Sequence, residues 1–256
     1  MAKGLVSIIT PSYNCARFLK DTIDSVQAQT YQDWEMIIVD DCSTDNTADL
    51  VASYMSQDKR IRYFCNEKNS GAAVSRNKAL REAKGKWMAF LDGDDTWAPN
   101  KLEHQIDFML QNGFAFSYHE YEEMDEDSHL LGIHVSGKTC VSKWEMYSCC
   151  WPGCLSVMYD RDAIGIIEIA DIKKNNDTAM WLKVAEKAKC YLLPESLAFY
   201  RRRQGSITPP TTVQKILWHY PLFHDAAGMN PLLAWFWTCI NIGGNMYKKI
   251  FYVKKN

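Results

Sequence analysis

The sequence has little net charge and no long run of apolar residues. Its 256 residues carry a formal net charge of −2. The chain therefore lacks the basic excess that favours binding to nucleic acid, and we expect no such partner. The densest apolar run, Pro231 to Ile242, contains Asn241 and is too short to span a bilayer. The first apolar run, Leu5 to Ile9, is also too short for the core of a signal peptide.

Paired cysteines and glycine-rich phosphate loops are missing as well. The nine cysteines are odd in number and follow no signal peptide, which favours reduced thiols in a cytoplasmic protein. Cys149, Cys150 and Cys154 have no second ligand pair at zinc-finger spacing, which disfavours a structural zinc site. Neither G-x-G-x-x-G nor G-x-x-x-x-G-K-[ST] occurs, so dinucleotide dehydrogenases and P-loop enzymes are disfavoured. A nucleotide bound here would be held by carboxylates and a metal.

An acidic turn is the most informative local feature. The apolar run Trp87 to Leu91 has the length and composition of a buried strand, and three aspartates follow it within four positions. Asp92 and Asp94 can converge on one point because Gly93 allows the backbone to turn between them. Carboxylate oxygens favour Mg²⁺ or Mn²⁺, which keeps open positions for substrate phosphates. The alternative is a solvated acidic turn, which Asp and Gly commonly form.

Strand and helix signals alternate over the first 120 residues, which predicts an α/β fold with a mostly parallel central sheet flanked by helices. The predicted strands are Val6–Ile9, Met36–Val39, Ile61–Phe64 and Trp87–Leu91. The predicted helices cover residues 17–29, 47–56, 72–83 and a segment that begins at Pro99. Ligands of such sheets bind beyond the carboxyl ends of the strands. Three polar clusters follow these ends, and we expect them to meet: Pro11–Asn14, Asp40–Asp41 and Asp92–Asp95.

Five motifs then follow one another along the chain. They are Val6-Ser7-Ile8-Ile9-Thr10-Pro11-Ser12-Tyr13-Asn14, Ser25-Val26-x-x-Gln29-Thr30-Tyr31-x-Asp33-Trp34-Glu35, Val39-Asp40-Asp41-Cys42-Ser43-Thr44-Asp45, Asn69-Ser70-Gly71-Ala72-Ala73-x-x-Arg76-Asn77 and Phe90-Leu91-Asp92-Gly93-Asp94-Asp95. In order and spacing they resemble the inverting family 2 glycosyltransferases, which have the GT-A (Rossmann-like) fold. The resemblance is specific from residue 5 to about residue 110, weaker from 115 to about 205, and absent after 210.

The resemblance implies which residues hold the nucleotide. Tyr13 and Asn14, next to Pro11, would lie against it. Asp41 would accept a hydrogen bond from the uracil imide, with Asp40 beside it, because an imide N–H needs an acceptor. Each residue also has an alternative reading from its type alone. Asn14 commonly forms an Asx-turn, Tyr13 can simply pack, and the aspartate pair can cap a helix.

The resemblance also implies how the diphosphate is held. Arg76 would approach the base or the diphosphate, although an arginine on a helix usually faces solvent. Asp92, followed by Gly93, would reach the ribose or the sugar. Asp94, with Asp92, would bind the Mn²⁺ or Mg²⁺ that bridges the two phosphates, since a leaving diphosphate needs neutralisation.

Inversion at the anomeric carbon needs a base on the face opposite the leaving diphosphate. The family usually has a Glu-Asp pair with a Trp a few residues later, and the matching stretch here is Asn175–Leu182. Asp177 would be the base, and Trp181 would pack near the acceptor or the donor sugar. Asn176 stands where Glu is common. The alternative is that Asp177 caps a helix over residues 178–188.

The segment from Phe199 to Ile207 resembles the final strand and mobile loop of the family. Arginines there would clamp a diphosphate, either of the donor or of a lipid-linked acceptor. Arg201 and Arg203 are expected to share one face because side chains alternate along a strand. The alternative is a solvated basic edge strand. Trp151, in the segment 151–156, is expected to line the donor-sugar or acceptor pocket.

From residue 218 onward aromatic side chains are mixed with lysines. They are Trp218, Trp235, Phe236, Trp237, Tyr247, Phe251 and Tyr252, with Lys248, Lys249, Lys254 and Lys255. Such a composition suits a segment, 218–256, that lies at a membrane interface, where anionic headgroups attract the lysines. The alternative is a helix or helix pair that packs on the domain or in a homodimer.

Together these observations predict three parts of the chain. Residues 1–115 form the nucleotide-sugar-binding half of a GT-A domain, residues 116–210 its acceptor-binding and catalytic half, and residues 211–256 a helical aromatic and basic extension. The expected enzyme is a cytoplasmic, metal-dependent, inverting hexosyl- or N-acetylhexosaminyltransferase, with peripheral placement on the inner face of the cell membrane if the tail binds there. It would use a UDP-sugar and a lipid-linked oligosaccharide acceptor in the synthesis of a capsule, O-antigen or exopolysaccharide.

Two alternatives to this function remain open. A nucleotidyltransferase would also bind nucleotide and metal on an α/β sheet, but it usually has a glycine-rich loop bearing Arg or Lys after its first strand, and Pro11–Asn14 is not such a loop. The other alternative is a non-catalytic domain that binds a sugar nucleotide and serves as an assembly partner. The presence of Asp92, Asp94 and Asp177 argues against it.

Overall fold

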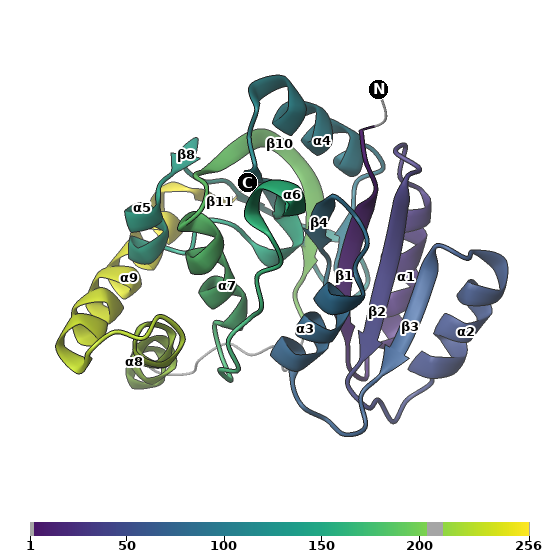
Figure 1. The fold of residues 1–256 in the computed structure, drawn as a ribbon, viewed down its shortest axis with the longest axis horizontal. Helices are drawn as coiled ribbons and strands as arrows, with labels where there is room; N and C mark the ends of the chain where they lie inside the picture. Colours follow the sequence, from purple (N-terminus) through teal and green to yellow (C-terminus); the bar gives the residue numbers. More distant parts are fainter. Residues whose placement is uncertain (1–2, 204–211, 256) are drawn as a thin grey trace.

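Eleven strands form one sheet with helices on both faces in a computed structural model that describes residues 3–203 and 212–255 (Figure 1). The strands are β1 (Val6–Ser12), β2 (Trp34–Asp40), β3 (Ile61–Cys65), β4 (Trp87–Phe90), β5 (Thr96–Trp97), β6 (Phe116–Met124), β7 (Leu130–Val135), β8 (Cys140–Val141), β9 (Met158–Asp160), β10 (Cys190–Arg201) and β11 (Val253–Lys255). The α-helices are α1 (Ala16–Gln27), α2 (Thr47–Gln57), α3 (Ala72–Glu82), α4 (Lys101–Asn112), α5 (Lys143–Ser148), α6 (Arg161–Ile164), α7 (Asn176–Ala185), α8 (Thr212–Pro221) and α9 (Pro231–Phe251). Two short helices of other types are η1 (Cys154–Ser156) and the π-helix η2 (Leu222–Ala226).

The first half of the chain forms the parallel part of the sheet. Its strands lie in the order β4, β1, β2, β3, and every neighbouring pair is parallel. Ile8 of β1 lies opposite Met36 on one side and Ala89 on the other. The four predicted strands and the helices predicted between them are confirmed, with ends shifted by at most three residues. The helix expected from Pro99 begins at Lys101.

Side chains of these strands alternate between two hydrophobic clusters, as the geometry of a strand requires. Ile9, Val39 and Phe90 belong to the cluster that includes the buried residues of α3 and α7. Ile8 and Ile38 belong to the other cluster, with buried residues of α1 and α4. Both faces are therefore covered by helices, which explains why these strands are almost continuously apolar.

The second half extends the sheet mainly with antiparallel strands. β9 lies between β4 and β6 and is antiparallel to both. β10, twelve residues long, runs parallel to β6 and carries the chain back to the acidic turn after β4. The predicted α/β fold is confirmed, and its parallel core is supplemented by these strands.

The C-terminal helices (α8, η2 and α9) pack beside α5 and α7, at the end of the molecule opposite α2 and β3 (Figure 1). β11 then returns the chain to the sheet, where it pairs antiparallel with β7. Close packing of α9 depends on Gly244, because a Cβ there would lie 2.0 Å from the carbonyl oxygen of Ser148. Among the described helices, none is long and apolar enough to cross a membrane.

Candidate active site

Loops from both halves of the chain line one open cleft of about 800 Å³ at the carboxyl ends of β1, β2 and β4. This volume suits a ligand as large as a nucleotide sugar, since such pockets span roughly 300–1,000 Å³. The predicted site residues that line it are Pro11, Tyr13, Asp41, Arg76, Asp92, Gly93, Asp94, Asp177, Arg201 and Arg203. The three polar clusters predicted to meet at one sheet edge therefore each contribute to the cleft.

Asp41 is buried at the floor of the cleft, where the loop before α3 surrounds its carboxylate. One oxygen accepts hydrogen bonds from the side chain of Asn66 and the backbone N–H of Ser70, both at 2.8 Å. The other accepts from the backbone N–H of Gly71 at 2.6 Å. Gly71 has φ +91°, a conformation that side chains disfavour. Because a carboxylate offers about four lone-pair sites, Asp41 retains capacity for one further donor.

Asp40 and Asn14 stabilise the loops around the cleft, and they are not among the described residues that line it. The carboxylate of Asp40 accepts hydrogen bonds from Ser43 and, at 2.7 Å, from the hydroxyl of Tyr63. Burial raises the pKa of Tyr63, and the hydrogen bond to Asp40 raises it further. The side-chain oxygen of Asn14 accepts from the backbone N–H of Thr44 at 2.8 Å. Tyr13, by contrast, is 48% exposed and faces the cleft.

Arg76 joins the two halves of the cleft. Its guanidinium donates to Asp92 at 2.6 Å and to the side-chain oxygen of Asn176 at 2.9 Å. Only 6% of the residue is exposed, and its Nε has no hydrogen-bond partner in the described part of the chain. Burial works against its charge, but Asp92 outweighs this and the pKa of Arg76 rises. Asn176, which departs from the family pattern, thus contacts the guanidinium that also holds Asp92.

The acidic turn concentrates negative charge beside Arg203. The Nε of Arg203 lies 2.7 Å from a carboxylate oxygen of Asp94. Burial and the charge of Asp92 raise the pKa of Asp94. Asp95 is buried, accepts from the backbone N–H of Arg201 at 2.8 Å, and has its pKa raised by burial and by Asp94. The ionised turn would therefore be stabilised by an additional cation.

Asp92 and Asp94 fit a divalent cation whose other ligands are waters and substrate phosphates. No group of three or more His, Cys, Asp or Glu side chains is arranged around a metal position in the residues that the structure describes. Two carboxylates at a cleft suit Mg²⁺ or Mn²⁺, because such ions usually keep waters and bind substrate phosphates. The φ angle of Gly93 is not positive, so a left-handed backbone is not the reason for glycine at this position. A Cβ there would instead lie 2.9 Å from the Sγ of Cys15, so glycine is needed for space.

Arg201 and Arg203 both reach the acidic turn, but their surroundings differ. Arg201 has a side chain with no exposed area, and its donors are used within the protein. They bind the carbonyls of Asp94, Asp125 and Glu126, the hydroxyl of Ser128 and the carboxylate of Asp21. Arg203 is one-third exposed and is therefore better placed to meet a ligand. Residues 204–207 of the expected mobile loop lie outside the described residues.

Asp177 lies in the first turn of α7 and is half-buried at the cleft. One carboxylate oxygen accepts from the backbone N–H of Thr178 at 2.8 Å, although the N-cap position of the helix belongs to Asn175. Asn175 precedes it with φ 55° and donates to the carbonyl of Trp218 at 3.0 Å. The Nζ of Lys174 lies 4.8 Å from the ring of Trp218. These contacts join α8 to the catalytic edge of the cleft.

Sequence reasoning missed several residues of this edge. Lys173, Lys174, Tyr200, Trp218 and His219 line the cleft. The two lysines directly precede the Asn-Asn-Asp stretch, and this position was the signal that could have placed them at the cleft. Nothing in the sequence indicates that α8 comes back to the start of α7.

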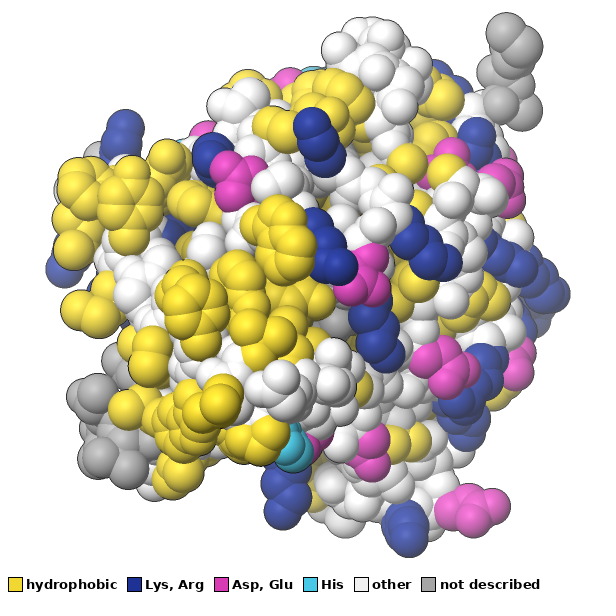
Figure 2. All heavy atoms as spheres, turned by 60° about the vertical axis from the view of Figure 1, so that its left-hand side comes forward, with side chains coloured by type: hydrophobic (Ala, Val, Ile, Leu, Met, Phe, Trp, Pro, Cys, Tyr) yellow, Lys and Arg dark blue, Asp and Glu magenta, His cyan; other side chains and the backbone are white. Residues whose placement is uncertain are grey.

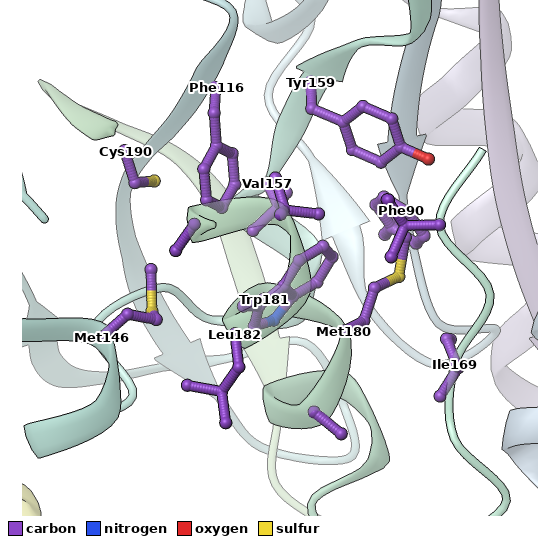
Figure 3. Packing of buried hydrophobic residues seen from close by; sticks show 14 of the residues in the cluster. Phe90, Phe116, Met146, Val157, Tyr159, Ile169, Met180, Trp181, Leu182 and Cys190 are labelled. Atoms are coloured by element: carbon purple, nitrogen blue, oxygen red, sulfur yellow. The ribbon is translucent and has the colours of Figure 1, made fainter. Parts of the chain in front are cut away.

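Two tryptophans expected near the donor sugar or the acceptor lie in the core instead, which corrects those predictions. Trp181 is fully buried on α7 and packs edge-on against Phe90, with ring centroids 4.9 Å apart (Figure 3). Trp151 is buried against Tyr252, and its indole N–H donates to the carbonyl of Glu145. The physical reason is the same for both, since these large apolar rings fill the space between α5, α7 and the sheet.

Comparisons with known proteins agree with this geometry. The family model described as "Glycosyl transferase family 2" matches residues 7–136. TuaG of Bacillus subtilis (strain 168), provisionally named a teichuronic acid biosynthesis glycosyltransferase, is 44% identical over 80% of this chain and 82% of its own. Escherichia coli WfgD, named a UDP-Glc:alpha-D-GlcNAc-diphosphoundecaprenol beta-1,3-glucosyltransferase, is 40% identical over 70% of this chain and 69% of its own. Residues 1–349 of S. aureus TarS, in complex with UDP-GlcNAc, superpose with a TM-score of 0.72 at 19% identity, over 90% of this chain and 69% of that one.

Proposed function

Because the chain belongs to glycosyl transferase family 2 and is a glycosyltransferase of GT-A fold, we propose a specific reaction for its cleft. The cleft binds a UDP-sugar and transfers the sugar, with inversion at the anomeric carbon, to a hydroxyl of a lipid-linked acceptor. The observation that carries this proposal is the meeting of Asp41, Arg76, Asp94 and Asp177 around one cleft, although they come from four separate segments.

The donor half of the cleft has the chemistry that a uridine diphosphate needs. Asp41 has an acceptor position left for the imide N–H of uracil, and Tyr13 presents an exposed ring to the base. Asp92 and Asp94 would hold Mn²⁺ or Mg²⁺. Such an ion neutralises the leaving diphosphate. Arg203 adds a partly exposed guanidinium beside the same turn.

Asp177 supplies the base. The acceptor hydroxyl loses its proton to this carboxylate as its oxygen forms a bond to the anomeric carbon. The bond between that carbon and the diphosphate oxygen breaks, and UDP leaves. Asp177 suits this task because it lines the cleft and, within the described part of the chain, its carboxylate accepts one hydrogen bond, from the backbone N–H of Thr178 at 2.8 Å.

The acceptor is a sugar linked through diphosphate to a lipid, and the product belongs to a surface polysaccharide. Support comes from WfgD, whose name specifies a diphosphoundecaprenol acceptor, and from TuaG, named for teichuronic acid biosynthesis. Lys173 and Lys174 at the edge of the cleft provide positive charge for such a diphosphate. An acceptor of this kind places the enzyme at the inner face of the cell membrane. The family assignment disfavours the nucleotidyltransferase alternative.

Nucleotide binding tests the donor site. UDP, GDP and CDP are compared by thermal shift, with and without Mn²⁺, on the wild type, on Asp94→Asn and on the control Asp49→Asn, which removes an exposed carboxylate of α2. At about a hundred times its Kd, a ligand stabilises by about 2.7 kcal/mol. For a chain of this size that corresponds to roughly 5–11 °C. We expect this shift for UDP with Mn²⁺, in the wild type and the control. A shift of equal size in Asp94→Asn, or none with any nucleotide, would contradict the proposed donor site.

A further inference from the structure

Helix α9 presents polar residues, together with Ala234 and Trp237, to the protein, and its outward side is apolar. Its buried positions include Thr238 and Asn241, and the side chain of Asn241 donates to the carbonyl of Tyr147 at 2.9 Å. One turn later Asn245 donates to the side chain of Asn241. The Nζ of Lys248 then donates to the carbonyls of Cys150 and Trp151, at 3.2 and 2.6 Å. These bonds fix the rotation of α9, so its outward face is set by the structure.

The outward face of α9 exposes large apolar side chains near both ends of the helix. Leu232 is 85% exposed, Ile250 69%, Met246 62% and Phe236 55%. No charged residue occurs between Pro231 and Tyr247. The exposed apolar residues of α8 and α9, here called the α8–α9 face, are Leu217, Leu232, Leu233, Trp235, Phe236, Met246, Tyr247, Ile250 and Phe251. Figure 2 shows hydrophobic side chains gathered on this side of the molecule.

A surface helix of a water-soluble protein normally has the opposite arrangement, with its apolar stripe inward. Contiguous exposed apolar patches mark sites that bind a partner or a membrane. The α8–α9 face therefore needs an apolar surrounding. The charged residues near this face indicate which apolar surrounding it meets.

Positive charge lies at one end of the α8–α9 face. Residues 212–255 contain five lysines and one acidic residue, Asp225, while the whole chain has a net charge of −2. Asp225 is paired with His224 at 2.6 Å. Lys249, Lys254 and Lys255 are exposed at the end of α9 and in β11. Two copies joined symmetrically through this face would bring lysines of the same sign together, whereas an anionic bilayer complements them.

We propose that the α8–α9 face seats the enzyme on the surface of an anionic lipid bilayer, with its aromatic and aliphatic side chains among the acyl chains and its lysines at the headgroups. Leu217 and Trp218 show why this face matters to the cleft. Leu217 is 59% exposed on the face, and its neighbour Trp218 lines the cleft. Helix α8 thus separates the bilayer from the cleft. A lipid-linked acceptor would present its diphosphate at that boundary, a detail that rests on the proposed function.

Vesicle binding tests this proposal without nucleotide or acceptor. The full chain is sedimented with vesicles of phosphatidylglycerol and phosphatidylcholine, and with vesicles of phosphatidylcholine alone. We expect binding that is stronger with phosphatidylglycerol and weaker at high salt. Leu232→Glu and Ile250→Glu should each reduce binding by about tenfold or more, because each removes a large apolar side chain from the interface. Leu110→Glu is the matched control, since Leu110 is exposed on α4, outside the α8–α9 face, and this variant should bind like the wild type.

The contribution of the lysines is measured with a second pair of variants. Lys254→Glu with Lys255→Glu should weaken binding to phosphatidylglycerol vesicles by roughly tenfold or more. The control, Lys59→Glu with Lys84→Glu, makes the same charge change at exposed lysines elsewhere and should have a smaller effect.

Three results would overturn the proposal: no binding to either vesicle, equal loss in Leu110→Glu, or a stable dimer in solution that Leu232→Glu dissociates. All of these variants alter exposed side chains, so melting temperatures near the wild-type value would show that they fold. We expect Ile250→Glu to lose vesicle binding. The same variant should still transfer sugar from the UDP-sugar to a water-soluble acceptor. Failure of transfer in the wild type, with vesicle binding intact, would contradict the proposed function and leave this inference standing.

Discussion

Asp92, Asp94 and Asp95 belong to one turn, but each has a different partner. Asp92 pairs with Arg76, Asp94 pairs with Arg203, and Asp95 accepts from the backbone N–H of Arg201. Asp95 is buried and does not belong to the described lining of the cleft, so its carboxyl serves the scaffold. The two aspartates left facing the cleft are those that we assign to the cation.

Burial of a titratable group away from the cleft gives a prediction about acid stability. His119 is 1% exposed, and burial, with the charge of Lys101, lowers its pKa to about 3. In the unfolded chain the pKa of histidine is about 6.5. Between these values the unfolded state binds a proton that the folded state does not. The free energy of unfolding should therefore fall with falling pH by about 1.4 kcal/mol per unit below pH 6.5.

Urea unfolding at pH 7.5 and pH 5.0 measures this effect. His119→Asn should lose about 2 kcal/mol less than the wild type on acidification. The asparagine amide can still donate to the carbonyl of Glu120, which His119 contacts at 2.7 Å. His129→Asn changes an exposed histidine and should behave like the wild type. An unchanged pH dependence in His119→Asn would show that the folded state accepts the proton.

The sequence predicted many of the side chains that line the cleft but not what each of them contacts. The carboxylates and arginines that line it follow the ends of apolar strands, and this pattern is visible in the sequence. The places of Trp151 and Trp181 were not predictable, because an aromatic ring suits a sugar pocket and a core equally well. Asp40 and Asp41 are adjacent and chemically identical, and only the folded loops show that Ser43 and Tyr63 bind the first while Gly71 binds the second.

At the scale of elements, α9 shows how two neighbouring glycines can have opposite effects. A Cβ at Gly244 would lie 2.0 Å from the carbonyl oxygen of Ser148, which is backbone and cannot easily move. A Cβ at Gly243 would meet nothing within 4 Å. Gly244→Ala should therefore destabilise the protein by about 1–3 kcal/mol. Gly243→Ala should stabilise it by up to about 1 kcal/mol, because alanine favours a helix.

Denaturant unfolding of the two variants checks this prediction. Each variant adds one methyl group to the same helix. The change in helix propensity is therefore matched, and only the packing differs. Equal effects from the two substitutions would mean that α9 is not held against α5 as described.

The elements differ in how far the sequence predicts them. β1, β2 and β4 are buried on both faces, β3 is a half-buried edge strand, and the apolar run of four or more residues in each gives a clear signal. β9 and β11 have three residues each, too few to show a period. The apolar and lysine content of α9 was visible, but its inward polar stripe was not interpretable until the hydrogen bonds of Asn241 and Lys248 were known.

For the whole molecule, the catalytic arrangement depends on contacts between distant parts of the chain. The family model ends at residue 136, and Asp177 lies beyond it. Arg76 connects the donor half to α7 through Asn176, one hundred residues later in the chain. Helix α8 then joins the start of α7 to the α8–α9 face through Asn175 and Trp218. The proposed donor site, the proposed base and the α8–α9 face are thus connected through these contacts.

The central claim is that this cleft performs inverting transfer from a UDP-sugar with Asp177 as the base. The most direct test measures transfer from UDP-hexoses and UDP-N-acetylhexosamines to GlcNAc-diphosphate carried on a short lipid, with Mn²⁺ present. Wild type, Asp177→Asn and the control Asp171→Asn, which changes an exposed aspartate of the same segment, are compared. We predict a product of inverted anomeric configuration, a fall in kcat of about 10²–10⁴ in Asp177→Asn with UDP binding retained, and no change in the control. Transfer by Asp177→Asn at the wild-type rate, or a product of retained configuration, would contradict the account.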